Sequence, residues 1–341
     1  MIERTIEIGA LELDGGQILP AVEQRIAIYG DTGCGRIALV HHALTGDHRA
    51  AAWWPGIVGE GALLDPREYC IVGINMLGSC YGSTQTRERI TIADIVRAQR
   101  RALDELGIER IDLAIGGSMG GMQALQWAHD APERVGRAVA IGAPDRTGTL
   151  AIALNSIQRD ALALDPVAGL GLARKIAMLS YKSDALLSRR HGRRPDRNGR
   201  KRFDIEGFLD LQAARILERI DAATYATLTH AMDSFDLRDG DWPENTPPLT
   251  FVGISSDTLF PARDIRDAAE RIACRGIDSR YIEFQSEHGH DAFLAEDTVL
   301  AELLAELAQA RFATPGYRSS TGSRSNLQFL HHPNAVVHKA P

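Results

Sequence analysis

Long hydrophobic runs are absent from this chain of 341 residues, and no apolar stretch is long enough to span a bilayer. The first residues, MIERTIEIGALELDGG, carry charges where a signal peptide needs its apolar centre. We therefore expect a cytoplasmic protein that is neither exported nor inserted in a membrane. The net charge of −7 gives no sign of a nucleic-acid partner.

Cysteine is also scarce in this sequence. The four cysteines, Cys34, Cys70, Cys80 and Cys274, are scattered without the spacing of a metal-ligand set. We expect reduced thiols, no disulfide framework and no metal site. The rest of the composition, 44% hydrophobic and 24% charged, is ordinary for a globular enzyme, and the length suits one large α/β domain or a core domain with an insertion.

Short β-rich apolar runs alternate with helical patterns along much of the chain. We predict strands at 25–30, 37–42, 69–75, 111–116, 137–143, 248–254 and 279–284, and helices at about 91–107, 262–272 and 291–309. Uninterrupted apolar runs of this kind are typical of strands that are buried on both faces of a mostly parallel sheet. The alternation predicts a doubly wound α/β core. Thr91 with Asp94 forms a capping-box pattern at the start of the first helix, and Gly107 is a stop signal at its end.

The stretch 148–237 interrupts this alternation, because it contains successive helical patterns and no convincing strand. We interpret it as a helical lid inserted between two parts of an α/β core, residues 1–147 and 238–312. The last segment, 313–341, is polar and without periodicity, so we expect a poorly ordered tail.

A basic run lies inside the predicted lid. The segment RRHGRRPDRNGRKR (189–202) has eight basic residues and one acid, Asp196. Runs of like charge are usually solvated loops. The alternative is an electropositive rim for an anionic substrate such as a nucleotide phosphate.

A glycine-rich turn, AIGGSMGGMQALQW (114–127), joins a predicted strand to a helical pattern. A dinucleotide-binding turn would need three glycines, but the middle place is Ser118, although an acidic residue, Asp145, does follow the next strand. The same residues match the nucleophile elbow G-x-S-x-G completely, with Gly116 and Gly120 flanking Ser118. The strand–turn–helix context favours the elbow.

A serine nucleophile needs a histidine base and a carboxylate that orients the base. Asp257 follows the predicted strand 248–254, and two histidines, His288 and His290, follow the last predicted strand. This is the order Ser, Asp, His of α/β hydrolases, although each residue alone would be an ordinary loop or helix-capping residue. The expected oxyanion donors are the backbone N–H groups of Met119 and Leu44.

Several segments together resemble the homoserine O-acetyltransferase family. They are HALTGDH (42–48), INMLGSCYGST (74–84), GGSMGGMQALQWA (116–128), GLARKIAMLSY (171–181), ERIDAATYATLTHAMDSFD (218–236) and GHDAFL (289–294). The resemblance implies an α/β-hydrolase fold and an acyl-CoA-dependent transfer to homoserine in methionine synthesis, with no bound cofactor and a homodimer formed through the lid.

The resemblance also implies roles for single residues. It favours His290 over His288 as the base, with Ser118 as nucleophile and Asp257 as the carboxylate. Asp291 would bind the amino group of the substrate, and Arg219 would bind its carboxylate. The alternative for Arg219 is a surface ion pair with Glu218 or Asp221.

Two segments are shorter than in the family, and both border the region that would receive the substrates, so the identities of the acyl donor and the acceptor stay open. The loop after Thr84 enters the next helix almost at once, and the lid is shortened before GLARK. Acetyl-CoA or succinyl-CoA could be the donor. Homoserine or serine could be the acceptor, since one methylene changes binding by only ~1–3 kcal/mol. A serine hydrolase would use the same triad with water.

Overall fold

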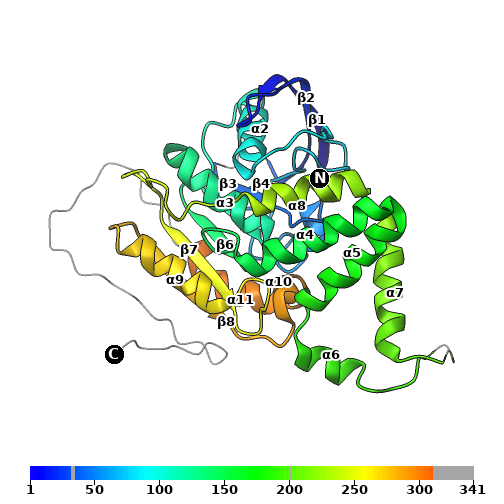
Figure 1. Cartoon of the computed structure of the whole chain (residues 1–341). Helices are drawn as coiled ribbons and strands as arrows, with labels where there is room; N and C mark the ends of the chain where they lie inside the picture. Colours follow the sequence, from blue (N-terminus) through cyan, green and yellow to red (C-terminus); the bar gives the residue numbers. More distant parts are fainter. Residues whose placement is uncertain (32–34, 198, 200, 310–341) are drawn as a thin grey trace.

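The computed structural model describes residues 1–31, 35–197, 199 and 201–309. Within these ranges eight strands form one sheet in the order β1-β2-β4-β3-β5-β6-β7-β8. The first two strands form an antiparallel hairpin whose second strand is antiparallel to β4, and the strands from β4 to β8 are parallel (Figure 1). The strands are β1 (Ile2–Glu12), β2 (Ile18–Tyr29), β3 (Ile37–His41), β4 (Cys70–Ile74), β5 (Leu113–Gly117), β6 (Ala138–Ile141), β7 (Leu249–Ile254) and β8 (Ser279–Phe284).

Helices cover both faces of this sheet because successive strand residues point to opposite faces. In β2, Ile26 and Ile28 join one apolar cluster, whereas Ala27 and Tyr29 join the other. The first cluster is completed by α2 (Ile92–Glu105), α3 (Met119–Asp130) and α9 (Ala262–Ala273), and the second by α1 (Ala50–Trp53), α10 (Ala292–Ala295) and α11 (Asp297–Gln309). The predicted doubly wound α/β architecture is confirmed.

The predicted capping box at the start of α2 is present. The Asp94 N–H donates to the Thr91 hydroxyl at 3.0 Å, and the Thr91 N–H donates to the Asp94 carboxylate at 2.9 Å. The helix ends at Glu105, and Gly107 follows with a φ of 68°, a conformation that glycine adopts without strain. The local signals in this stretch therefore set both ends of the helix.

Two parts of the fold differ from the sequence-based expectation. The N-terminal hairpin includes β1, for which no strand was predicted; irregular pairing around Gly9 disrupts its pattern. The single helix expected at 291–309 was wrong, because the chain forms a 3-10 turn, η2 (Gly289–Asp291), then α10 and then α11. The break comes before Asp297, whose carboxylate accepts the Gly56 N–H at 2.7 Å and so fixes the start of α11.

Between β6 and β7, the described residues form five helices, which lie toward the right in Figure 1. They are α4 (Thr149–Leu164), α5 (Pro166–Tyr181), α6 (Asp184–Arg190), α7 (Asp204–Leu217) and α8 (Ala222–Asp233), and we call them the lid helices. The two ends of this segment meet at the core, where the Thr147 N–H donates to the Phe235 carbonyl at 2.9 Å. The predicted tail, 313–341, lies outside the described residues. None of the described helices is long and apolar enough to cross a membrane.

Candidate active site

Ser118 occupies the turn between β5 and α3 in a strained backbone conformation. Its φ of 57° and ψ of −126° make it the one residue other than glycine with positive φ among the residues described. The neighbouring glycines permit this turn, since a Cβ atom on Gly116 would overlap the backbone of Gly120, and one on Gly120 would overlap the His41 carbonyl. The strain and the close packing together present the serine at the end of β5.

Asp257 and His290 meet at the same edge of the sheet. Asp257 follows β7 and His290 lies in η2 after β8, so both come from the carboxyl ends of parallel strands. The Asp257 Oδ2 lies 2.6 Å from the His290 Nδ1, and its Oδ1 accepts the N–H groups of Leu259 and Phe260 at 2.8 and 3.0 Å. Both side chains are buried. The carboxylate is therefore fixed at one oxygen and orients the imidazole with the other.

The environment of His290 raises its pKa. Burial alone would lower the pKa, but the negative charge of Asp257 and the hydrogen bond to it outweigh this effect. The rings of Tyr181, Phe260 and Phe293 surround the imidazole at centroid distances of 5.6, 5.4 and 5.7 Å. The Nε2 is buried and has no hydrogen-bond partner among the described residues. This nitrogen is thus left for proton exchange.

Ser118 and His290 approach the same small region from two sides. The Ser118 N–H donates to the Ile141 carbonyl at 2.8 Å, and a Cβ atom on the next residue, Gly142, would lie 3.3 Å from the His290 ring. On the other side, Phe293 contacts both His290 and Gly117, the residue before the serine. His288 does not take part in this arrangement. Its backbone N–H donates to the Ser286 hydroxyl, and Asp257 is paired with His290 instead.

The two expected oxyanion donors also lie close to this turn. Met119 is the first residue of α3, so its N–H has no acceptor within the helix. Leu44 is buried in the loop after β3. Gly120 packs against the carbonyl of His41 at the end of β3, which places the start of α3 beside that loop.

Arg219 lies beside the loop that carries Leu44. One of its terminal nitrogens donates to the Thr45 carbonyl at 2.9 Å, and its Nε lies 3.4 Å from the Tyr81 hydroxyl. Among the described residues its guanidinium forms no ion pair, so the pairing with Glu218 or Asp221 is not present. The Arg219 guanidinium, which has no carboxylate partner among the described residues, therefore contacts Thr45, the residue next to the predicted oxyanion donor Leu44.

Comparison with known proteins agrees with this fold. The family model described as "alpha/beta hydrolase fold" matches residues 39–297. Homoserine O-acetyltransferases from Deinococcus radiodurans and Moorella thermoacetica are 40% and 36% identical; each match covers 86% of this chain and 88% and 92% of the relative. The chain belongs to the homoserine O-acetyltransferase family. A crystal structure of homoserine O-acetyltransferase from Staphylococcus aureus superposes with a TM-score of 0.80 at 26% identity, covering 92% of this chain and 97% of that chain.

Membership of the homoserine O-acetyltransferase family confirms the resemblance drawn from GGSMGGMQ and GHDAFL. In the sequence, Asp145 was the acidic residue compatible with a dinucleotide-binding site. In the structure it is buried and accepts two hydrogen bonds from Arg271 at 2.8 and 3.0 Å. No group of three or more His, Cys, Asp or Glu side chains within the described part of the chain is arranged to hold a metal ion.

The sequence analysis did not predict two residues that contact the predicted substrate-binding residues Asp291 and Arg219. Lys182 follows α5 directly, and its Nζ lies 2.8 Å from the Asp291 Oδ2. Tyr81 faces Arg219. Both residues lie within or next to segments that carried the family resemblance, but no spacing rule connects positions so far apart in the chain.

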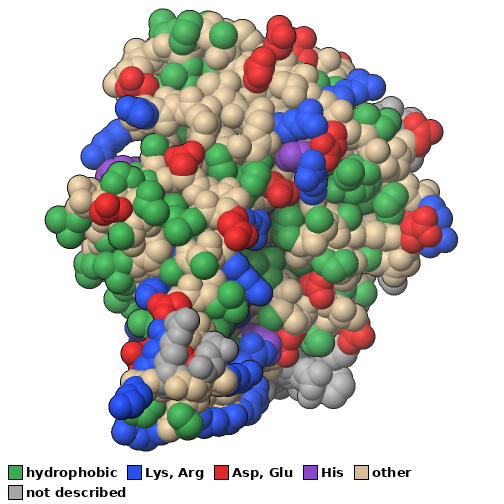
Figure 2. All heavy atoms as spheres, turned by 90° about the vertical axis from the view of Figure 1, so that its right-hand side faces the viewer, with side chains coloured by type: hydrophobic (Ala, Val, Ile, Leu, Met, Phe, Trp, Pro, Cys, Tyr) green, Lys and Arg blue, Asp and Glu red, His purple; other side chains and the backbone are tan. Residues whose placement is uncertain are grey.

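Three of the eight basic residues in the run 189–202 form ion pairs with acids among the described residues. Lys and Arg side chains gather at the lower end of the face in Figure 2, around α6 and the loop that follows it. Three of the arginines pair with nearby acids: Arg189 with Glu287, Arg197 with Asp204, and Arg202 with Asp196 and Asp210. These pairs favour the interpretation as a solvated structural loop in this homoserine O-acetyltransferase family member.

Proposed function

We propose that this protein transfers an acyl group from acyl-CoA to the hydroxyl of L-homoserine in methionine synthesis. The observation that carries the proposal is the buried Asp257–His290 pair beside the strained Ser118, with an Nε2 that has no partner in the described part of the chain. Relatives 36–40% identical over most of the chain carry the name of this activity. No bound cofactor is needed, since acyl-CoA is a co-substrate.

The first half-reaction acylates the serine. His290 Nε2 takes the proton from the Ser118 hydroxyl while the oxygen attacks the thioester carbonyl. The N–H groups of Met119 and Leu44 stabilise the tetrahedral oxyanion. The carbon–sulfur bond then breaks, and the proton passes from His290 to the CoA thiolate, which leaves as the thiol. Asp257 holds the imidazole tautomer and stabilises its charged form.

The second half-reaction runs through the same groups in reverse. His290 takes the proton of the homoserine hydroxyl, whose oxygen attacks the acyl carbonyl on Ser118. The bond from the carbonyl carbon to the serine oxygen breaks, and that oxygen recovers the proton from His290. The scheme therefore returns the enzyme to its starting state after one transfer.

Two charged residues would position the amino acid. Arg219 has no carboxylate partner among the described residues and would receive the substrate carboxylate as a planar fork. Asp291 would receive the ammonium group, for which it must exchange its contact with Lys182. An acceptor bound between these charges would present its side-chain hydroxyl near the acyl-serine.

A thiol-release assay would test the proposal. Acetyl-CoA and succinyl-CoA would each be combined with homoserine, with serine or with no acceptor, and free CoA would be measured. We expect release that depends on homoserine, with acetyl-CoA as the better donor. Release at the same rate without an acceptor would instead identify a serine hydrolase, and serine-dependent release would identify a serine O-acyltransferase.

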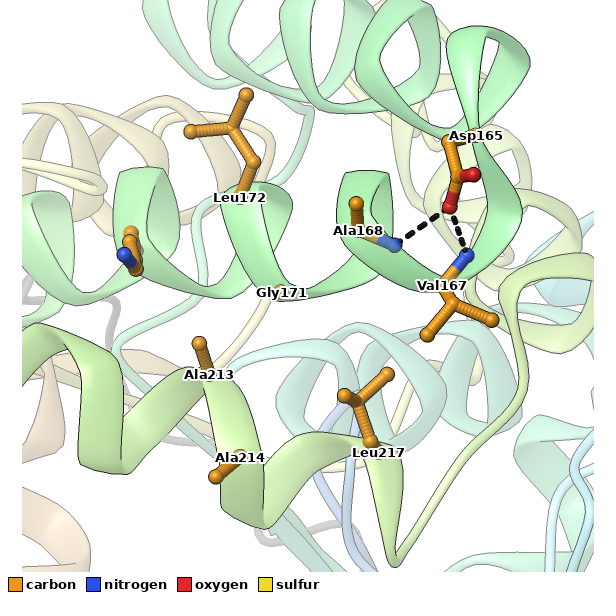
Figure 3. Close-up of a pocket in the computed structure, with 9 residues that line it drawn as sticks. Asp165, Val167, Ala168, Gly171, Leu172, Ala213, Ala214 and Leu217 are labelled. Carbon is orange, nitrogen blue, oxygen red and sulfur yellow. Dashed lines mark hydrogen bonds between the residues drawn. The ribbon is translucent and has the colours of Figure 1, made fainter.

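We also propose that the protein acts as a homodimer through its lid helices in the cytoplasm, where acyl-CoA is made and used. Hydrophobic side chains form patches on the face that carries the lid helices (Figure 2). On α5 and α7, Leu172 and Leu217 are 49% and 43% exposed and line a groove between the two helices (Figure 3). Exposed apolar side chains in such a patch are typical of an interface, and a second copy of the lid would cover them.

A further inference from the structure

His42 is a buried histidine next to the loop that carries Leu44. Its side chain is 1% exposed, and both ring nitrogens have backbone partners. The Met76 N–H lies 3.0 Å from Nε2, and the Ala43 carbonyl lies 2.8 Å from Nδ1. Because a backbone N–H can only donate, Nε2 must accept. The proton is therefore on Nδ1, which donates to the Ala43 carbonyl.

Burial keeps this imidazole neutral. It lowers the pKa of His42 to about 4, against smaller opposing effects of the Ala43 carbonyl and Asp47. At neutral pH, His42 therefore holds one tautomer with one donor and one acceptor.

The bond to Ala43 fixes the direction of the Leu44 N–H. The Ala43 carbonyl and the Leu44 N–H belong to the same peptide group, and no described peptide bond is cis. In a planar trans peptide, the C=O and the N–H point in opposite directions. The Gly46 N–H donates to the same carbonyl at 2.9 Å, so two donors hold it. The Leu44 N–H must therefore point away from them.

The other predicted oxyanion donor is oriented in the same way. The Ser118 carbonyl accepts the N–H groups of Gly121 and Met122 at 2.8 and 3.1 Å, and the Met119 N–H lies on the opposite side of that peptide. The buried Gln123 amide ties the first turn of α3 to the loop after β3, because its Nε2 donates to the carbonyls of Met119 and His42 at 3.1 and 3.3 Å.

We infer that His42 is a positioning residue for the transferase reaction, whose Nδ1–H orients the Ala43–Leu44 peptide so that the Leu44 N–H meets the developing oxyanion. This inference rests on the proposed acyl-serine mechanism. It does not depend on which acceptor completes the reaction. The oxyanion carries its full charge only in the tetrahedral state, so the effect of His42 belongs to the transition state.

Two substitutions separate the roles of the two ring nitrogens. In His42→Asn the side-chain amide can occupy the place of Nδ1 and still donate to the Ala43 carbonyl. In His42→Gln the longer side chain can reach the Met76 N–H as Nε2 does but loses the bond to Ala43. His48→Asn is the matched control, since His48 is buried in the same segment and lies 3.6 Å from Glu3 rather than on the peptide of Leu44.

The readout is the acylation of Ser118 by p-nitrophenyl acetate, which needs neither CoA nor homoserine, together with the melting temperature of each variant. Complete loss of an oxyanion donor costs about 10²–10³-fold in kcat. We expect His42→Gln to lose about 10–100-fold in the acylation rate constant with little change in KM, and His42→Asn to stay within about threefold of the wild type. Equal losses in the two variants, or a normal rate in His42→Gln, would overturn the inference.

A measurement on the unaltered protein covers the case in which a variant does not fold. Histidine labelled with ¹⁵N reports the tautomer directly, and we expect the signal assigned to His42 to show a protonated Nδ1 and an unprotonated Nε2 that does not titrate between pH 5 and 8. A protonated Nε2 would contradict the inference. Failure of homoserine transfer with these results unchanged would remove the proposed acceptor but leave the role of His42 in place.

Discussion

His290 Nδ1 lies 2.6 Å from Asp257 Oδ2 in a site where both side chains are buried, and the opposite ring nitrogen has no partner within the described chain. Such a pair can move a proton at one nitrogen while the carboxylate stabilises the charge that results. Most of the expected behaviour of the protein follows from this relationship.

Ser118→Ala should abolish acyl transfer. Removing the nucleophile should lower kcat by several orders of magnitude, because the members of a triad act as a unit. CoA release is the measurement, and Ser234→Ala, at the end of α8, is a serine control that should keep its activity. Near-normal turnover of Ser118→Ala would refute the scheme.

The pH dependence should report the raised pKa of His290. The base must be neutral, so kcat/KM should fall as the pH drops through a value above the ordinary ~6.5. Asp257→Asn removes the charge that raises this pKa, so burial should move the acidic limb to lower pH. The same change should lower the maximal rate on the order of 10⁴-fold, as loss of the carboxylate does in other triads. A limb that stays in place would show that another group titrates.

Lys182→Met should change the pH profile and the binding of the acceptor together. Lys182 lowers the pKa of His290 and pairs with Asp291 at 2.8 Å. Without it, the acidic limb should move to higher pH, and the KM for homoserine should fall because no side chain competes for Asp291. Steady-state kinetics from pH 5 to 9 measure both effects. A higher KM would mean that Lys182, rather than Asp291, contacts the substrate.

Arg219→Ala should weaken binding of the amino acid without affecting acylation. The loss of charge-assisted hydrogen bonds, about 1.5–3 kcal/mol, corresponds to a rise of about 10–100-fold in the KM for homoserine. Hydrolysis of p-nitrophenyl acetate should remain within about twofold. Arg215→Ala, in the last turn of α7, provides the matched control. Equal effects of the two substitutions would remove Arg219 from the acceptor site.

Leu172→Asp combined with Leu217→Asp should convert a dimer into a monomer, because both side chains are exposed in the groove of the lid. Light scattering coupled to size-exclusion chromatography measures the mass. Ile18→Asp, at a position 64% exposed in β2, introduces a similar charge away from the lid and should leave the dimer intact. A monomeric wild-type protein would exclude the proposed assembly.

Local sequence patterns predicted the parts of the fold that depend on neighbours in the chain. The G-x-S-x-G turn predicted the strained serine, and Thr91 with Asp94 predicted the start of α2. The same reasoning missed β1, whose pairing is irregular around Gly9, and it joined Asp291, the last residue of η2, with α10 and α11 into one helix. The break before Asp297 depends on Gly56, which is far away in the sequence.

The sequence by itself determined the α/β alternation and predicted the nucleophile and the order of the triad, because each prediction follows from local conformation or from residues at strand ends. Without the family resemblance, only the tertiary structure shows which histidine contacts Asp257. It also shows that Lys182 forms an ion pair with Asp291. It also decided that His42 holds the peptide of Leu44. The packing of the sheet sets how the segments and loop atoms in these contacts are oriented toward one another. No residue spacing along the chain encodes that orientation.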